Sequence, residues 1–334
     1  MNKAEDKLKR HAVGCLRAGL AVSVWLVAAV FLGAQQQTSA AQLASEGWTA
    51  FQQGRLDDAK QSLDKAVSLD PNDADYQAAL AEVDSRMKQQ DAAIEHFRKA
   101  IALSPSDAEF RFDLAQILQT ENKDQEALRV LQGAHPGPGL SDAWHFSRGF
   151  SLFRTGRFSV ASEEFKAIAE KPGFKASASF FLGNIAYSQD EFEQAGRYLA
   201  TAVKLGNVAD NKAYNAYTYD YGLVLMKLGR YEEAAAEFKA SIERYNNDPL
   251  PWMFLGRCEE QMGNYPAAIE MLETSIKKNP NFQLSYYELA RLQQRHGDPQ
   301  RAAELFRKIG TMKEEEITAE ENRAMKLRTE AGPQ

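Results

Sequence analysis

The sequence predicts an all-α fold, an α-solenoid of about eight helix-turn-helix repeats. Three observations predict it. Alanines recur every 34 residues, large apolar residues follow each alanine at helical spacing, and glycine or proline stands where helices should end. A period of roughly 20–50 residues is typical of repeat architectures, in which each unit is stable only when it packs on its neighbours.

The alanine series sets the register, and its spacing resumes after one five-residue insertion. Its members are Ala59, Ala93, Ala127, Ala161, Ala195, Ala234, Ala268 and Ala302. Four residues later stand Leu63, Phe97, Leu131, Phe165, Leu199, Phe238, Leu272 and Phe306. Seven residues later stand Ala66, Ala100, Ala134, Ile168, Ala202, Ser241, Ser275 and Ile309. Residues at spacing 0, 4 and 7 share one face of a helix, so each set predicts the buried face of a second helix.

Proline and glycine mark the ends of these helices. Proline follows twelve residues after the alanine at Pro71, Pro105 and Pro280, where it stops the second helix of a repeat. Glycine precedes the alanine by five residues at Gly54, Gly156, Gly229, Gly263 and Gly297. Glycine at that point suits a left-handed turn between the two helices of a repeat.

Small residues recur at position eight, counted from the first residue of each repeat. They are Gly47, Ala81, Ala115, Gly149, Gly183, Gly222, Gly256 and Ala290, and they let the paired helices approach closely. The predicted repeats span about 40–73, 74–107, 108–141, 142–175, 176–214, 215–248, 249–282 and 283–310.

These residues resemble the tetratricopeptide repeat, whose signature is a large residue, Leu-Gly, an aromatic, Ala, Phe, Ala and Pro within 34 positions. Residues 249–282 match it through Trp252, Leu255, Gly256, Gly263, Tyr265, Ala268, Leu272 and Pro280. The resemblance covers about 40–310 and implies a right-handed superhelix. We assign the repeat array to residues 42–310.

The array departs from regularity at three places. Pro136 should end the second helix of repeat three early, and we expect a bend between repeats 1–3 and repeats 4–8. The insertion near 206–214 should lengthen the loop between repeats five and six. Residues 311–334 are expected to form a charged capping helix, near 314–328, and a loose tail.

Residues 1–41 have the layout of an export segment. A basic stretch leads into an uncharged apolar run at 18–34, and small residues follow. This order predicts a signal peptide, with an uncleaved signal anchor as the alternative. Both place the array outside the cytoplasm, in the periplasm or cell envelope, either free or anchored at its N-terminus, because the basic flank stays inside.

Charge narrows the class of partner. The chain has 40 basic and 46 acidic side chains, and without residues 1–41 the balance is 35 to 44, a net charge of −9. An acidic body does not attract phosphate backbones, so we expect no nucleic acid partner. Membrane contact is expected only through an uncleaved N-terminal segment. Cys258 is the one cysteine beyond that segment, so no internal disulfide is expected in the array.

The family resemblance implies that the first helix of each repeat lines a concave surface, through positions two, five, nine, twelve and thirteen. The polar members of this groove are Asp75, Glu82, Ser85, Arg86, Gln116, Arg154 and Arg295. The predicted partner-binding residues are Phe112, Phe146, Phe150, Phe153, Phe180, Asn184, Tyr187, Tyr219, Met226, Met253, Arg257, Tyr287 and Arg291. This groove would be aromatic in the middle and basic at its C-terminal end. The alternative is that several of these rings pack between helices as core.

Catalytic and metal-binding patterns do not emerge from the sequence. His96, His135, His145 and His296 are scattered, with His96 expected in solvent on an outer helix. Neither metal-ligand spacing nor a phosphate loop is present. The chain is therefore expected to be no enzyme, without cofactor or metal, and to bind an unidentified protein or peptide as an exported scaffold. A self-assembling structural envelope protein, as a homo-oligomer, is the alternative, and an enzyme with an unrecognised site is a remote one.

The register predicts the effect of enlarging a small packing residue. Replacing Ala195 or Ala268 with leucine should lower the free energy of unfolding by about 1–3 kcal/mol, because the paired helices are overpacked there. Thermal melting of each variant checks this. An unchanged melting temperature in either variant would contradict the register.

Overall fold

The computed structural model describes residues 39–206 and 211–312, with no account of the side chains of 211–215. Within these ranges every regular element is a helix, which confirms the all-α prediction. The helices are α2 (Ala40–Gln52), α3 (Leu56–Leu69), α4 (Ala74–Arg86), α5 (Gln90–Leu103), α6 (Ala108–Thr120), α7 (Asp124–Leu131), α8 (Ser141–Arg154), α9 (Phe158–Ile168), α10 (Lys175–Ser188), α11 (Phe192–Leu205), α12 (Asn211–Lys227), α13 (Tyr231–Arg244), α14 (Pro249–Gln261), α15 (Tyr265–Lys278), α16 (Gln283–His296) and α17 (Pro299–Gly310).

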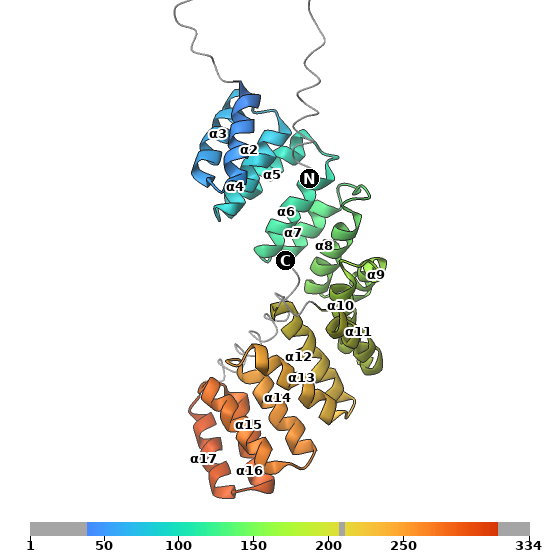
Figure 1. The fold of residues 1–334 in the computed structure, drawn as a ribbon, viewed down its shortest axis with the longest axis vertical. Coiled ribbons are helices and arrows are strands. Elements are labelled where there is room, and N and C mark those ends of the chain that lie inside the picture. The colour runs from blue at the N-terminus through green and yellow to red at the C-terminus, as the bar shows by residue number, and fades with distance from the viewer. Residues whose placement is uncertain (1–38, 207–210, 313–334) are drawn as a thin grey trace, which may run out of the picture. The chain divides into compact units, whose positions relative to one another are not determined.

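The helices form eight successive antiparallel pairs, as Figure 1 shows, from α2 with α3 to α16 with α17. We call the first helix of each pair the A helix and the second the B helix. Within each compact unit, the B helix of one pair also packs on the A helix of the next, for example α3 on α4 and α15 on α16. This is the stacked arrangement of an α-solenoid, so the predicted fold class is confirmed.

The predicted packing register is confirmed by burial. All eight alanines of the 34-residue series lie on B helices and are at most 2% exposed. The large residues four positions later are also buried from Leu63 to Leu272. Phe306, in the last pair, is the exception, since it is 38% exposed.

The turn between A and B helix uses a left-handed residue in seven of the eight described pairs. Gly54, Gly156, Gly229 and Gly263 have φ between 74° and 81° as predicted, and Lys88, Asn122 and Asp190 hold φ near 60° at the same place. The prediction is wrong for Gly297, which has φ −143°. There the Gln293 side chain accepts a hydrogen bond from the Asp298 N–H at 2.8 Å, and Asp298 in turn caps α17. This local capping replaces the left-handed turn that joins the helices of the other pairs.

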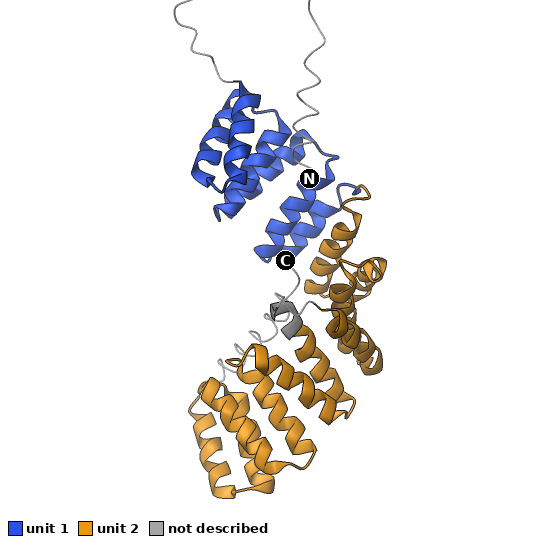
Figure 2. Cartoon of the chain, viewed as in Figure 1, with its two compact units in different colours: residues 1–136 blue, residues 137–334 orange. Residues whose placement is uncertain are grey.

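The chain divides into two compact units, residues 1–136 and 137–334, drawn in different colours in Figure 2. The division falls at the predicted irregularity. Helix α7, which ends before it, has only 8 residues against the 14 of α5, so the early stop expected from Pro136 is confirmed. The bend between repeats 1–3 and repeats 4–8 stays a prediction.

The insertion near 206–214 was predicted to lengthen the loop between repeats five and six, but part of it belongs to helix α12. Helix α11 ends at Leu205 and α12 already begins at Asn211, so α12 has 17 residues where the other A helices have 13 or 14. Part of the insertion therefore lengthens a helix. The export segment up to residue 38 and the capping helix near 314–328 lie outside the described residues.

Close approach within a pair depends on the small residue at position eight. A Cβ atom added to Gly183 of α10 would lie 2.6 Å from Cγ of Leu199 and 3.3 Å from the carbonyl oxygen of Ala195, both on α11. Those distances are below van der Waals contact, so α10 and α11 would have to separate. By contrast, a Cβ added to Gly196 on α11 would meet Leu228 at 3.5 Å, an ordinary contact.

These two glycines predict opposite outcomes for the same substitution. Gly183→Ala should lower the free energy of unfolding by about 1–3 kcal/mol through overpacking. Gly196→Ala should raise it by up to about 1 kcal/mol, because alanine favours a helix over glycine and fits there. Denaturant unfolding of both variants checks this, and equal shifts of the same sign would contradict the close contact.

Candidate functional site

The A helices present the residues predicted to bind a partner, but position five is mostly a packing position. Phe180, Tyr219 and Met253 are buried in the core, so the expectation that their side chains line a groove is corrected. The reason is that position five faces the following helix pair: Phe180 contacts the ring of Tyr217 on α12, with ring centroids 4.9 Å apart. Tyr287 of the last pair is exposed.

The aromatic residues of α8 gather around one ring that the sequence did not single out. Phe181 of α10 is fully buried, and its ring centroid lies 5.2–5.8 Å from those of Phe146, Phe150 and Phe153. It also stacks on Phe165 of α9 at 4.8 Å. The three α8 rings remain half-buried. They are thus at the edge of a core cluster, and each exposes only part of its surface.

Four other predicted residues keep partly accessible side chains on A helices. Asn184 donates a hydrogen bond to the carbonyl of Phe180 at 3.1 Å, which holds its amide against its own helix. Tyr187 packs on Phe192 of α11, with centroids 5.6 Å apart. Met226 packs against a core cluster, and Phe112 is half-buried on α6. The structure therefore places these residues on the expected helices as a partly apolar surface.

Two of the three arginines at the predicted basic end of the groove, Arg257 and Arg291, are paired with acidic side chains, and the third, Arg295, is exposed. Arg291 of α16 binds Glu260 of α14 at 2.6 Å and Glu288 at 2.8 Å, and Arg257 lies 3.8 Å from Glu288. Arg257 also lies over the ring of Phe254. Both predicted arginines are thus paired with acidic groups, and the expectation of a free basic surface from them is corrected.

An open hollow on the first unit brings predicted groove residues of two successive A helices together. It has a volume of about 410 Å³ and lies at the C-terminal ends of α4 and α6. Glu82, Ser85 and Arg86 of α4 and Gln116 of α6 line it, at the positions that the family resemblance implies. Phe51, Gln90, Phe97, Asp113, Ile117 and Thr120 complete the lining.

Polar and apolar groups are arranged in this hollow so that it offers both kinds of contact. Phe97 and Ile117 are buried and give an apolar floor. The guanidinium of Arg86 lies over the ring of Phe51 at 5.8 Å. The side-chain oxygen of Gln90 is buried without a hydrogen-bond partner. Such a mixture fits a peptide segment, which presents apolar side chains together with backbone donors.

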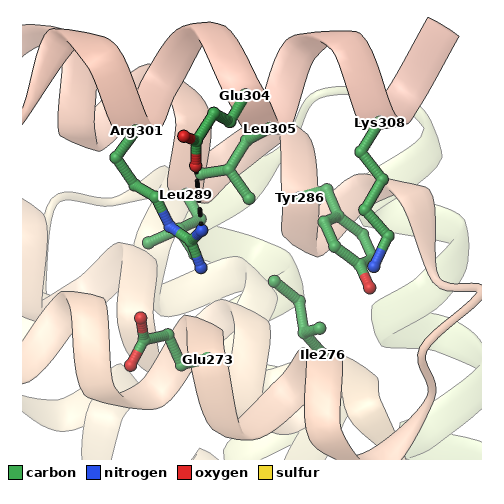
Figure 3. A pocket seen from close by; sticks show the side chains of 8 residues that line it. All are labelled: Glu273, Ile276, Tyr286, Leu289, Arg301, Glu304, Leu305 and Lys308. Atoms are coloured by element: carbon green, nitrogen blue, oxygen red, sulfur yellow. Dashed lines mark hydrogen bonds and ion pairs between the residues drawn. The ribbon is translucent and has the colours of Figure 1, made fainter.

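A second hollow, shown in Figure 3, lies between the B helices α15 and α17 over α16 and has a volume of about 370 Å³. Three of the four charged side chains that line it are engaged with each other or with a ring. Arg301 binds Glu304 at 3.1 Å, and Nζ of Lys308 lies 4.5 Å from the centroid of the Tyr286 ring. It contains none of the predicted binding residues, so the A-helix hollow is the better candidate.

Ionisable side chains inside the array serve the packing of helices. Asp84 is fully buried on α4 and binds Lys60 of α3, with Nε2 of His96 at 3.8 Å from it. His96 also bonds to Gln77 at 2.8 Å, so the expectation that it is solvated is corrected. Burial lowers the pKa of His96, partly offset by the Asp84 charge. In unit 2, Glu164 of α9 holds His145 at 2.8 Å and Arg148 at 3.2 Å in the same way.

The described cysteine, histidine and acidic side chains were examined for nucleophilic and metal-binding arrangements. Cys258 is buried, and burial raises the pKa of its thiol to about 12, so it is a thiol at neutral pH and a poor nucleophile. Across the residues that the structure describes, histidine, cysteine and acidic side chains form no group of three that could hold a metal ion. Among the described helices, none is both long and apolar enough to cross a membrane.

Comparison with protein families gives three matching models, each described as a tetratricopeptide repeat. One matches residues 85–136 and 225–289, the second 147–212 and 191–249, and the third 43–73. Together the matches reach all eight helix pairs. In the last pair they cover part of α16 and none of α17. Among curated proteins, none matches the chain.

Solved structures align with this chain at low sequence identity. The crystal structure of the APC/C hetero-tetramer Cut9–Hcn1 aligns with a TM-score of 0.55 and 16% identity, over 78% of this chain and 49% of that chain. The crystal structure of MamA aligns over 51% of this chain and 96% of its own, with 19% identity and a TM-score of 0.45. MamA 41-end from Desulfovibrio magneticus RS-1 covers 52% and 94%, with 18% identity and a TM-score of 0.47.

The paired arginines predict unequal effects of removing charge. Arg291→Met should lower the free energy of unfolding by about 1–3 kcal/mol, because Glu260, only 6% exposed, loses its partner. Arg257→Met, at a more exposed and longer ion pair, should change it by less than about 1 kcal/mol. Denaturant unfolding measures the free energy of unfolding of both variants. An Arg291→Met variant with unchanged stability would contradict a stabilising ion pair between Arg291 and Glu260.

Proposed function

Because this chain belongs to the tetratricopeptide repeat family, we propose that it is a protein-interaction scaffold whose A helices bind a segment of a partner protein. The hollow on α4 and α6 carries this proposal. Residues at the equivalent positions of two successive repeats meet in it, and side chains of the described residues leave about 410 Å³ open. A surface built by repetition offers equivalent contacts along an extended chain.

The chemistry of the hollow favours an extended peptide as occupant. Its floor is apolar, and its rim carries Glu82, Arg86, Asp113 and Gln116, so it contacts apolar side chains and hydrogen-bonding groups of a ligand at once. The half-buried rings of Phe146, Phe150 and Phe153 add a second, apolar contact surface on unit 2. Rigid rings bind with a small loss of side-chain entropy.

We further propose that the scaffold works outside the cytoplasm, in the periplasm or cell envelope. The support is the order of basic, apolar and small residues in 1–41, with the apolar run at 18–34. Signal cleavage and anchoring differ in whether residue 42 becomes the N-terminus, and N-terminal sequencing of the exported protein distinguishes them.

The proposal predicts that blocking the hollow abolishes partner capture. Ser85→Arg plus Gln116→Arg should remove from a crosslinked cell-envelope pull-down the proteins that the wild-type chain retains, because two long cationic side chains fill the hollow. The matched control is Ser68→Arg plus Ala102→Arg, which adds the same charge at exposed sites on the B helices α3 and α5.

Retention of the same proteins by all three chains would place binding elsewhere and contradict the proposal. Helical circular dichroism verifies that each variant is folded. Loss of capture in both variants would show a nonspecific effect of charge. The self-assembling alternative is tested by the same samples, because it requires a size in solution that grows with concentration.

A further inference from the structure

Charge is distributed unevenly along the array, and the A helices of unit 1 carry an acidic excess. Residues 39–136 contain 17 acidic and 10 basic side chains, a net charge of −7, whereas residues 137–312 contain 21 of each. In unit 1 the A helices α2, α4 and α6 have six acidic residues and two basic ones. In unit 2 the five A helices have five acidic and eight basic residues. A ligand on the A helices of unit 1 therefore meets a negative potential.

The two basic residues on the unit 1 A helices do not cancel this charge at the hollow on α4 and α6. Arg111 of α6 donates hydrogen bonds to the carbonyl oxygen of Pro105 at 2.9 and 3.1 Å, and it does not line the hollow. Arg86 of α4 does line it, and its guanidinium lies over the ring of Phe51 at 5.8 Å. Among the described residues that line the hollow, Arg86 is the only basic one.

The acidic groups of the hollow come from two successive A helices. Of the six acidic residues on the unit 1 A helices, Asp84 is buried. Glu82 of α4 and Asp113 of α6 are partly accessible and line the hollow. Two carboxylates thus stand against one guanidinium in the lining, so the hollow favours a positively charged group over a negatively charged one.

A buried hydrogen-bond acceptor adds a second preference of the same kind. Oε1 of Gln90, at the start of α5, has no hydrogen-bond partner, and Gln90 lines the hollow. Buried acceptors are normally paired, so a donor on a ligand suits this oxygen. Phe97 and Ile117 form the apolar floor beside it and can contact an apolar side chain. The hollow therefore combines hydrogen-bond acceptors, an excess of negative charge and an apolar floor.

We propose that the hollow on α4 and α6 binds a segment of the partner protein in which lysine or arginine stands beside an apolar side chain. The cation interacts with Glu82 and Asp113, the apolar side chain lies on the floor, and a donor of the segment bonds to Gln90. The inference rests on the proposed function, because it names the chemistry of the segment that the A helices bind. Repulsion from the acidic A helices excludes acidic segments, which makes charge a basis of partner selection.

Fluorescence anisotropy of the full chain with short labelled peptides of equal length tests this. The three probes are repeats of Leu-Lys-Ser, Leu-Glu-Ser and Ser-Lys-Ser. The Leu-Lys-Ser peptide should bind about tenfold or more tightly than the Leu-Glu-Ser peptide, because opposite charge attracts it. It should also bind about tenfold more tightly than the Ser-Lys-Ser peptide, which has no side chain for the apolar floor. Added salt should reduce the difference between the lysine and glutamate peptides.

Two double variants locate the charge preference. Glu82→Gln plus Asp113→Asn should weaken binding of the Leu-Lys-Ser peptide about tenfold, because the cation loses both carboxylates. The matched control is Asp64→Asn plus Glu95→Gln, which removes the same two charges at exposed sites on the B helices α3 and α5 and should bind as the wild type does. Equal weakening in both variants would assign the effect to net charge and overturn the inference. Unchanged binding in the Glu82→Gln plus Asp113→Asn variant would overturn it as well.

The outcomes separate this inference from the proposed function. A Leu-Glu-Ser peptide that binds as tightly as Leu-Lys-Ser, and is released by Ser85→Arg plus Gln116→Arg, would overturn the preference for a cation and leave the hollow as a peptide site. Failure of all three peptides to bind would also overturn the inference, while the crosslinked pull-down decides the proposed function independently.

Discussion

The close contact between the A and B helix of each pair is the constraint on which the rest of the structure depends. It requires a small residue at position eight opposite a large residue of the B helix, as Gly183 lies against Leu199 and Gly256 against Leu272. Because the pair is held so tightly, its large side chains are directed to the layer between pairs, where burial of each stabilises the stack by about 1.5–3 kcal/mol. A pair alone exposes that layer, so the array is cooperative along its length.

This use of the large residues determines what is left for binding. The side chains of Phe180, Tyr219 and Met253 are buried. Part of the surface of three more rings packs in the cluster around Phe181, those of Phe146, Phe150 and Phe153. Among the surfaces that remain open on the described A helices of unit 1 is the mixed polar and apolar hollow on α4 and α6. A scaffold of this kind binds through several modest contacts, and its specificity depends on where polar groups are placed.

Local repeat chemistry made the helix pairs, their register, four of the glycine turns and the short α7 predictable from the sequence. Contacts between different helix pairs could not be predicted from the sequence pattern. Position five was predicted to face a groove. The residues that bury it belong to the following helix pair, so the pattern of a single helix does not reveal them. The pairs Arg257–Glu288 and Arg291–Glu260 were missed because each joins residues 31 positions apart on neighbouring A helices, and the sequence analysis considered one repeat at a time. Asp84 was missed for the same reason, since Lys60 comes from the preceding pair.

The central claim is that a partner binds the A helices, and site-specific photo-crosslinking tests it most directly. A photoreactive side chain placed at Gln116, in the hollow, is compared with one at Ala102, exposed on the B helix α5. The account predicts covalent adducts with a partner protein from position 116 and none from position 102. Adducts from position 102 alone would contradict it and move the binding surface to the B helices.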